Sequence, residues 1–240
     1  SFLGISGAIL ICGSRGAVLG ALVTGVVAWA RNLRRIGVAL VFLLAIPGII
    51  YLLPDASKDR MRSGMNWEQD GTASHRMALW RAGLRMFRDN PLLGVGPGNY
   101  AAHYSAKYSE PDQDPAGWVA HSIYIEALSE LGAAGMLPLI FLVFTFFRLN
   151  ARTRKFLEGD AAKQKSFEYI LALGLDLAMV GYLVSGAFLT VLYYPHLWVM
   201  LGLSVGLHTA VTSRANSRPK QVRRSRFSPL RSPTDRIIGC

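Results

Sequence analysis

Long apolar stretches separated by short basic segments limit most strongly how this chain of 240 residues can fold. Residues 36–53 contain no charged side chain, and residues 169–190 contain a single acid, Asp176. Neither stretch has a polar face to turn toward water, so a buried helix of a soluble domain explains them poorly. Because the hydrocarbon core of a bilayer takes about 20 helical residues, we interpret the chain as an integral membrane protein.

Composition supports this interpretation and excludes two other classes. Charged residues make up 17% of the chain, below the roughly 25% of soluble domains, and the mean hydropathy is +0.29. The apolar fraction of 51% excludes a disordered chain, and the two cysteines, Cys12 and Cys240, exclude a disulfide scaffold. The chain opens inside apolar sequence with no preceding basic stretch, which is typical of a piece of a longer protein and not of a signal peptide.

The expected fold class is an all-α integral membrane protein, a polytopic helical bundle with a large extracytoplasmic loop that contains amphipathic helices. The expected spans are residues 2–13, 16–30, 36–53, 132–147, 169–190 and 197–211. A single helix over residues 2–30 would place Arg15 at mid-membrane depth, which costs several kcal/mol on insertion scales. Two shorter helices are therefore favoured there.

The distribution of charge predicts the orientation. Three segments, 31–35, 148–168 and 213–240, together carry 17 basic and 4 acidic residues, whereas residues 54–120 carry 8 of each. Positive segments face the cytoplasm, so the neutral region is expected outside it. The predicted division has four parts. Residues 1–53 are transmembrane helices with the first truncated, 54–120 are an extracytoplasmic loop with candidate functional motifs, 121–212 are transmembrane helices, and 213–240 are a basic disordered cytoplasmic tail. The tail is interpreted as juxtamembrane charge on anionic lipid; the alternative is a nucleic-acid arm.

The extracytoplasmic loop contains a predicted amphipathic helix over residues 74–88. Its apolar face is expected to consist of residues at three- and four-residue spacing, namely Met77, Trp80, Leu84 and Phe87. Four arginines lie on this helix: Arg76, Arg81, Arg85 and Arg88. The following glycine-rich run over 94–98 lacks the Lys-Ser/Thr of a nucleotide-binding loop, so it is interpreted as a tight turn that re-enters the membrane region.

Two residue types suit chemistry on an anionic substrate. Arg15 is expected at the extracytoplasmic end of span 16–30, at the depth of phosphate groups, and its planar fork of donors matches phosphate. An anchor for the helix end is the alternative. His121, with Glu126 and Glu130 on the following turns, could accept a proton near neutral pH, or could simply begin the helix. The sequence shows no metal-ligand spacing and no Gly-x-Ser-x-Gly elbow.

Three motifs in this order resemble the O-antigen ligase family, which includes polysaccharide polymerases and protein O-oligosaccharyltransferases. They are Ser14-Arg15-Gly16-Ala17, the Arg76-x-x-x-Trp80 helix that runs into Pro91-Leu92-Leu93-Gly94-Val95-Gly96, and His121-Ser122 followed by nine residues and Gly132-x-x-Gly135. The third is the most specific, because it fixes residue types and spacing together. The resemblance covers residues 1 to about 211 and matches the C-terminal half of the longer family members, whose fold resembles GT-C-type glycosyltransferases.

The resemblance implies a metal-independent glycosyltransferase without cofactor. It would move a glycan from undecaprenyl pyrophosphate to lipid A-core, or to another glycan or protein acceptor, on the periplasmic face of the bacterial inner membrane. Arg15 and Arg76 would hold the pyrophosphate, and His121 would act on the acceptor hydroxyl. Further candidates for substrate binding are Arg81, Glu130, Trp80 and Tyr100, the last two with packing as the alternative.

Two functional alternatives remain open, and the isolated segment is expected to be inactive. Within the family, the chain is a polysaccharide polymerase or a protein O-oligosaccharyltransferase instead of a ligase. From another class, it is a membrane transporter subunit for an anionic solute, with Arg15 and Asp176 along the pathway. Nucleic acid is not expected as a partner.

Overall fold

The computed structural model describes residues 15–31, 71–109, 118–158 and 166–216, and all regular elements in these residues are helical. They are α2 (Arg15–Arg31), α5 (Gly71–Asp89), α6 (Tyr100–His103), the π-helical turn η1 (Tyr104–Tyr108), α7 (Ile123–Leu157), α8 (Phe167–Gly186) and α9 (Pro195–Asn216). The all-helical expectation is confirmed for this part of the chain. The expected spans 2–13 and 36–53, and the tail beyond residue 216, lie outside the described residues.

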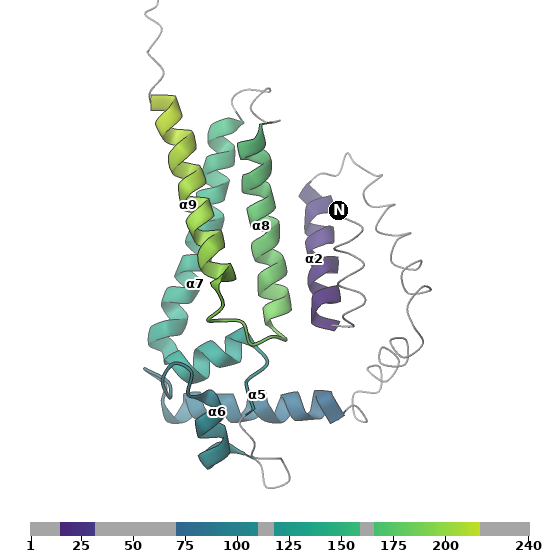
Figure 1. Ribbon diagram of the computed structural model, residues 1–240, viewed down its shortest axis with the longest axis vertical. Helices are drawn as coiled ribbons and strands as arrows, with labels where there is room; N and C mark the ends of the chain where they lie inside the picture. Colours follow the sequence, from purple (N-terminus) through teal and green to yellow (C-terminus); the bar gives the residue numbers. More distant parts are fainter. Residues whose placement is uncertain (1–14, 32–70, 110–117, 159–165, 217–240) are drawn as a thin grey trace, which may run out of the picture.

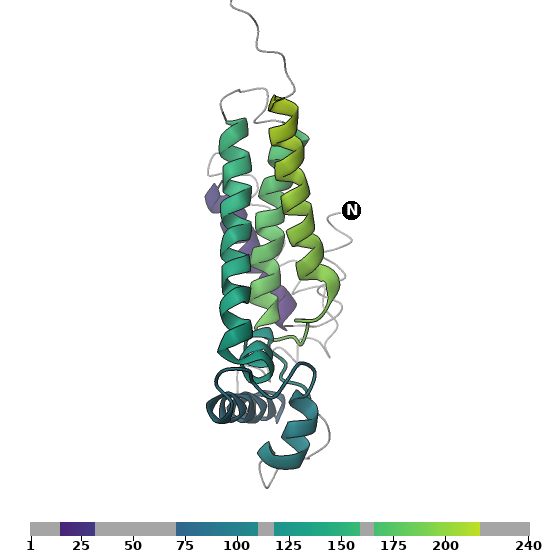
Figure 2. The same cartoon turned by 90° about the vertical axis from the view of Figure 1, so that its left-hand side faces the viewer.

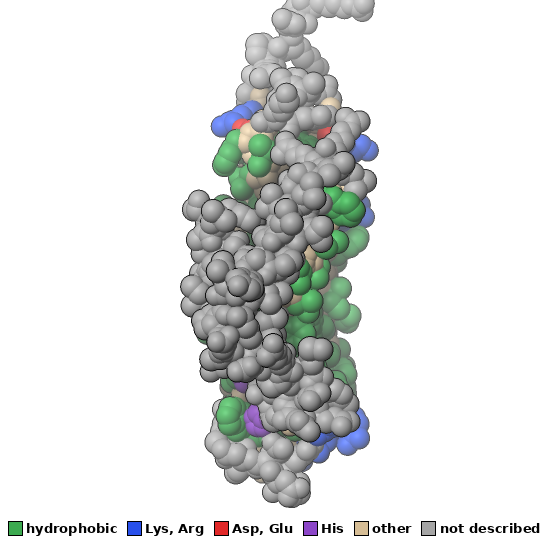
Figure 3. All heavy atoms as spheres, turned by 90° about the vertical axis from the view of Figure 1, so that its right-hand side faces the viewer, with side chains coloured by type: hydrophobic (Ala, Val, Ile, Leu, Met, Phe, Trp, Pro, Cys, Tyr) green, Lys and Arg blue, Asp and Glu red, His purple; other side chains and the backbone are tan. Residues whose placement is uncertain are grey.

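Three long helices, α7, α8 and α9, lie side by side, and α2 packs against α8 (Figures 1 and 2). Helix α5 lies across one end of this bundle, with α6 beside it (Figure 1). The end of α9 and the basic end of α7 lie at the opposite end of the bundle. On the face in Figure 3, Lys and Arg side chains are visible mainly toward the two ends, and the coloured strip between them is mostly hydrophobic.

Two of the described helices are long and apolar enough to cross a membrane. These are α7, which contains the expected span 132–147, and α8, which covers residues 169–186 of the expected span 169–190. Helix α2 is apolar over 16–30 but shorter. Helix α9 covers the expected span 197–211, but it is not among the helices that are both long and apolar enough to cross a membrane. The many large apolar side chains exposed on α7, α8 and α9 fit a surface that faces lipid.

Helix α7 is longer than expected and bends at Gly132. It begins at Ile123 and ends at Leu157, and Gly132 has φ 60° and ψ −162°. The bend frees backbone groups on both sides of it, and the turn over residues 91–96 binds them. The amides of residues 95 and 96 donate to the carbonyls of 129 and 130 at 2.8 and 2.9 Å, and the amides of 133 and 134 donate to the carbonyls of 91 and 92 at 2.9 Å. The glycine-rich run is thus a turn, and it stabilises the kink of α7.

Substitution of Gly132 by alanine is expected to destabilise the protein. A Cβ at Gly132 would lie 2.5 Å from the Leu92 carbonyl oxygen, in a backbone conformation that costs an L residue about 1–3 kcal/mol before any clash. The thermal midpoint of the purified variant in detergent should therefore fall. Gly206→Ala on α9, where a Cβ meets nothing within 4 Å, is the matched control, and equal midpoints for the two variants would contradict this account.

Helix α5 confirms the predicted amphipathic helix, but only part of its predicted apolar face packs inside the protein. Met77 and Leu84 are 44% and 49% exposed, whereas the fully buried residues are Ala78, Leu79, Ala82 and Met86. The small residues decide this orientation, because they let α5 approach α7 closely. A Cβ at Gly83 would lie 2.4 Å from the Ile125 side chain.

The helical pair at the C-terminal end also differs from the expectation. Helix α8 ends at Gly186 and not at residue 190, because its last turn tightens into bonds from residue 187 to 184, 188 to 185 and 189 to 186. Residues 187–194 form the connection to α9, which we call the α8–α9 turn. Helix α9 continues to Asn216, so the start of the expected disordered tail at 213 is wrong.

Asp176 is buried within α8 and paired. Its carboxylate accepts from the Arg154 guanidinium of α7 at 2.5 Å and from the Asn150 amide at 2.9 Å. The Ser204 hydroxyl of α9 donates to the Asn150 side-chain oxygen at 2.7 Å. This polar network links the three bundle helices, and it satisfies a charge that would otherwise be costly in a membrane helix.

Candidate active site

His121 has a constrained backbone conformation at the junction between the loop and α7. Its φ of 49° lies in the left-handed region, which side chains other than glycine rarely adopt. The His121 amide donates to the Thr190 hydroxyl oxygen of the α8–α9 turn at 2.9 Å. Such strained residues persist where the surrounding structure holds them, and they cluster at functional sites. The predicted catalytic histidine is therefore held by a partner 69 positions away in the sequence.

Trp80 connects α5 to the His121 segment. Its indole nitrogen donates to the carbonyl oxygen of Ala120 at 3.0 Å, directly before His121. Its ring centre lies 6.4 Å from that of Phe188 in the α8–α9 turn. Trp80 is partly buried by these contacts, which position the histidine whether or not the ring also touches a sugar.

The same turn brings α2 to this end of the bundle. A Cβ at Gly16 would lie 3.1 Å from Phe188, and the Ser185 hydroxyl donates to the Gly16 carbonyl oxygen at 3.3 Å. The first residue of α2, Arg15, therefore begins beside the turn that also holds His121. The structure describes the backbone of Arg15 and not its side chain.

Arg76 of α5 acts on His121 through its charge. Burial lowers the pKa of His121 below its ordinary value of 6.5, and electrostatic interaction with Arg76 and His75 lowers the pKa further. The half-buried His75 is itself held edge-on against Trp118, with ring centres 4.6 Å apart. A neutral imidazole beside a guanidinium is suited to accept a proton next to an anion.

Glu130 joins three separate segments through its buried carboxylate. The carboxylate accepts from the amides of Gly98 and Tyr100 at 2.7 and 2.9 Å, and from the Tyr193 hydroxyl of the α8–α9 turn at 2.5 Å. Glu130 is 2% exposed, so these chain partners occupy its oxygens. Its geometry fits a residue that orients the glycine-rich turn.

The remaining candidates from the sequence lie elsewhere. Tyr100 is 2% exposed, and its hydroxyl donates to the Leu79 carbonyl oxygen at 2.5 Å, which corresponds to the packing alternative. Arg81 is exposed on α5. Arg85, on the same helix, donates to the Tyr108 carbonyl oxygen at 2.6 Å. The structure therefore brings His121, Trp80, Arg76 and the start of α2 together, and places Arg81 and Tyr100 outside that group.

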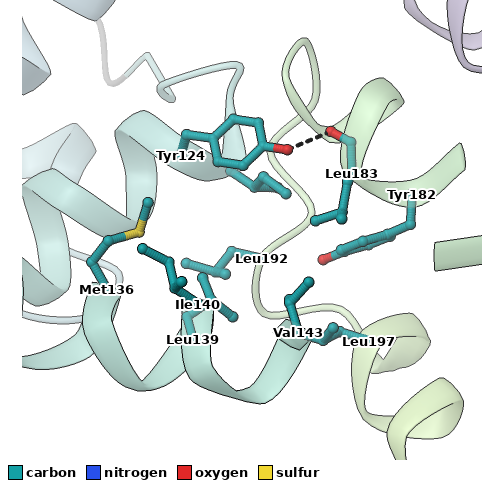
Figure 4. Close-up of a pocket in the computed structure, with 10 residues that line it drawn as sticks. Tyr124, Met136, Leu139, Ile140, Val143, Tyr182, Leu183, Leu192 and Leu197 are labelled. Carbon is teal, nitrogen blue, oxygen red and sulfur yellow. Dashed lines mark hydrogen bonds between the residues drawn. The ribbon is translucent and has the colours of Figure 1, made fainter. Parts of the chain in front are cut away.

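An apolar cavity of about 200 Å³ lies behind the His121 segment (Figure 4). Its lining comes from the start of α7, the end of α8 and the α8–α9 turn, and includes Ile123, Met136 and Leu192. The hydroxyls of its two tyrosines already donate, Tyr124 to the Leu183 carbonyl at 2.8 Å and Tyr182 to the Val191 carbonyl at 3.1 Å. The cavity therefore offers an apolar surface and no free polar group for a sugar or a phosphate.

Sequence reasoning missed the contribution of the α8–α9 turn. Thr190, Phe188 and Tyr193 contact the three motifs, yet no local pattern marks them. The close packing of α2 on α8 does have a signal, the four-residue spacing of small residues at Gly16 and Gly20. A Cβ at Gly20 would lie 2.1 Å from the Ser185 hydroxyl oxygen, so this glycine sets the separation of the two helices.

Comparison with known proteins identifies related sequences. The family model described as O-antigen ligase matches residues 1–156. The exopolysaccharide production protein ExoQ of Rhizobium meliloti (strain 1021) is 31% identical over 87 residues, which cover 33% of this chain and 19% of ExoQ. The matched stretch is thus about a fifth of the length of that relative. No solved structure matches the chain.

Proposed function

Since the chain belongs to the O-antigen ligase family, we propose that it forms the catalytic part of a glycosyltransferase that uses a polyprenyl-pyrophosphate-linked glycan. The observation that carries this proposal is the position of His121, which is held in a left-handed conformation within electrostatic reach of Arg76, at one end of the helices that are long enough to cross a membrane. The donor is undecaprenyl pyrophosphate carrying a finished glycan, and the acceptor is lipid A-core or a similar hydroxyl-bearing molecule.

The reaction needs one proton acceptor and a site for negative charge. The acceptor hydroxyl oxygen attacks the anomeric carbon, the bond from that carbon to the pyrophosphate oxygen breaks, and the hydroxyl proton passes to the neutral imidazole of His121. The polyprenyl pyrophosphate leaves with the bonding electron pair. Arg76 and Arg15 stabilise the charge that develops on it, in the role that donors of an oxyanion hole have in acyl transfer.

The other predicted residues support these three. Glu130 positions the glycine-rich turn, and Trp80 positions the His121 segment. Arginine charge takes the place of a metal ion in this proposal, so EDTA is expected to leave the rate of transfer unchanged.

The expected topology places this site on the periplasmic face of a multi-pass inner-membrane protein with a GT-C-like bundle. The α5 end of the bundle would then be outside, and the basic ends of α7 and α9 would lie at the cytoplasm. A transporter for an anionic solute has less support, since Asp176 pairs with Arg154 and Asn150 instead of remaining available along a pathway.

A second function within the family is favoured by one observation. The relative with 31% identity over 87 residues is an exopolysaccharide production protein, so our second candidate is a polymerase that joins glycan repeats. Protein O-oligosaccharyltransferase is the remaining family alternative. All of these use the same donor chemistry and differ in the acceptor hydroxyl.

Cells that lack the protein provide the direct test. We expect lipid-linked glycan to accumulate and the exported glycoconjugate to disappear, and both to return when the full protein is expressed. The missing product identifies the acceptor: lipid A-core glycan for a ligase, long-chain polysaccharide for a polymerase. Normal levels of lipid-linked glycan in these cells would contradict the proposed function.

The dependence of transfer on pH follows from the lowered pKa of His121. The imidazole accepts a proton only when neutral, and a lowered pKa keeps it neutral to more acidic pH. We expect the acid limb of kcat/KM to have its midpoint below 6.5, the ordinary value for histidine. A midpoint above this value, measured with isolated membranes and a lipid-linked donor, would contradict the assignment.

A further inference from the structure

Among the described residues, the α8–α9 turn contacts all three motifs, which lie far from it in the sequence. Phe188 lies against Gly16 of α2 and near Trp80 of α5. Thr190 accepts from the His121 amide, and Tyr193 donates to Glu130. A segment of eight residues thus determines how these elements meet.

The contact at Thr190 differs from the others because it acts on a strained residue. A left-handed histidine persists only if contacts with its neighbours offset the conformational strain. The His121 amide donates to the Thr190 hydroxyl oxygen at 2.9 Å. His121 directly precedes Ser122, the residue before the first turn of α7, so the ring direction follows from this backbone conformation.

Hydrogen bonds from two tyrosines hold the end of α8 and the turn that follows it, so the turn can act as a rigid support. The Tyr124 hydroxyl donates to the Leu183 carbonyl, the interaction drawn in Figure 4, and the Tyr182 hydroxyl donates to the Val191 carbonyl next to Thr190. The buried apolar side chains of Ile123 and Leu192 pack in one cluster with both tyrosines. The Thr190 hydroxyl is therefore presented to His121 from a position that packing determines.

We propose that Thr190 is a positioning residue, whose hydroxyl holds His121 in the left-handed conformation that directs its imidazole toward the reacting hydroxyl. The proposal rests on the proposed function only for its effect on catalysis. Without the Thr190 oxygen, the His121 amide loses its partner and the residue relaxes toward an ordinary backbone conformation. The ring then leaves the position in which it is partly buried beside Arg76 and His75, the charged and titratable groups of α5 that face it.

The test compares Thr190→Val, which removes the acceptor oxygen at similar size, with Thr190→Ser, which retains it. In the full protein we expect T190V to lower kcat about tenfold while KM for the lipid-linked donor changes less than about twofold. T190S should restore kcat to near the parent rate. Thr209→Val is the matched control, because that hydroxyl is exposed on α9 and bonds only within its own helix, to the Val205 carbonyl.

A second readout does not depend on transferase activity. Diethyl pyrocarbonate acylates neutral imidazole, so the rate of modification of the His121 peptide against pH, followed by mass spectrometry, reports the titration of that ring. We expect the midpoint to move upward in T190V and to stay at the parent value in T190S and T209V. If T190V is not recovered folded, Thr190→Cys, with a weaker acceptor of similar size, replaces it.

The two readouts separate the outcomes. A lower kcat with a shifted modification midpoint, both restored by serine, supports the positioning role. Parent kcat with an unshifted midpoint in T190V overturns it, and so does a lower kcat that serine does not restore while the midpoint stays unshifted. If the midpoint shifts in T190V but the parent protein itself transfers no glycan, the role of Thr190 is supported and the proposed function is overturned.

Discussion

Replacement of His121 by asparagine is expected to lower the rate of glycan transfer by about 10²–10⁴-fold, the usual contribution of a general base. Asparagine tolerates the left-handed conformation that His121 adopts, so the backbone and the bond to Thr190 should be retained. The variant removes the proton acceptor and little else. His121→Ala is expected to lose activity to the same extent, with an additional cost from strain.

The measurement is complementation of cells that lack the protein, with the lipid-linked glycan and the exported product quantified together. His103→Asn is the matched control, because this histidine of α6 lies in none of the three motifs and should leave transfer at the parent rate. Membrane insertion is followed by the yield of protein in the membrane fraction. Parent activity in the His121→Asn variant would remove the acid–base assignment.

Replacement of Arg76 by alanine is expected to lower transfer by about 10²–10³-fold, the effect of removing one donor that stabilises charge in a transition state. Arg76→Lys retains the charge but loses the planar fork, so an intermediate rate is expected. Arg88→Ala is the control on the same helix: its side chain is 79% exposed at the far end of α5, beside Asp89. Equal rates for the Arg76 and Arg88 variants would exclude a special role for Arg76.

The Arg76 variant also has a consequence for pH. The guanidinium disfavours the protonated form of His121, so its removal should raise the pKa of that imidazole. The acid limb of kcat/KM should move to higher pH in Arg76→Ala and remain in place in Arg88→Ala. An acid limb that stays in place in the Arg76 variant would show that the two residues do not interact. Arg15→Ala is expected to reduce the rate of transfer as strongly as Arg76→Ala.

The local elements of the candidate site were predictable from spacing. The helix over 74–88 corresponds to α5, the glycine-rich run is a turn, and His121 immediately precedes a helix. These features depend on neighbours within a few positions, since helix periodicity and the conformational freedom of glycine are local properties.

The buried face of α5 and the kink of α7 were not predictable in the same way. Large apolar residues mark an apolar face, yet Met77 and Leu84 are exposed while Ala82 and Gly83 contact α7, because small residues allow the closest approach between helices. The kink at Gly132 depends on hydrogen bonds from a turn some forty positions earlier, which no pattern around Gly132 reveals.

The sequence by itself determined that the chain is helical and suited to a membrane, and it supplied the motifs that place it in a family, because length, hydropathy and residue spacing are carried by each segment alone. Only the tertiary structure decided which residues meet. Thr190 and His121 are 69 positions apart, and their contact requires α7, α8 and the turn after α8 to be packed together. A hydrogen bond forms only where two atoms come within about 3 Å, and that distance is set by the packing of whole helices.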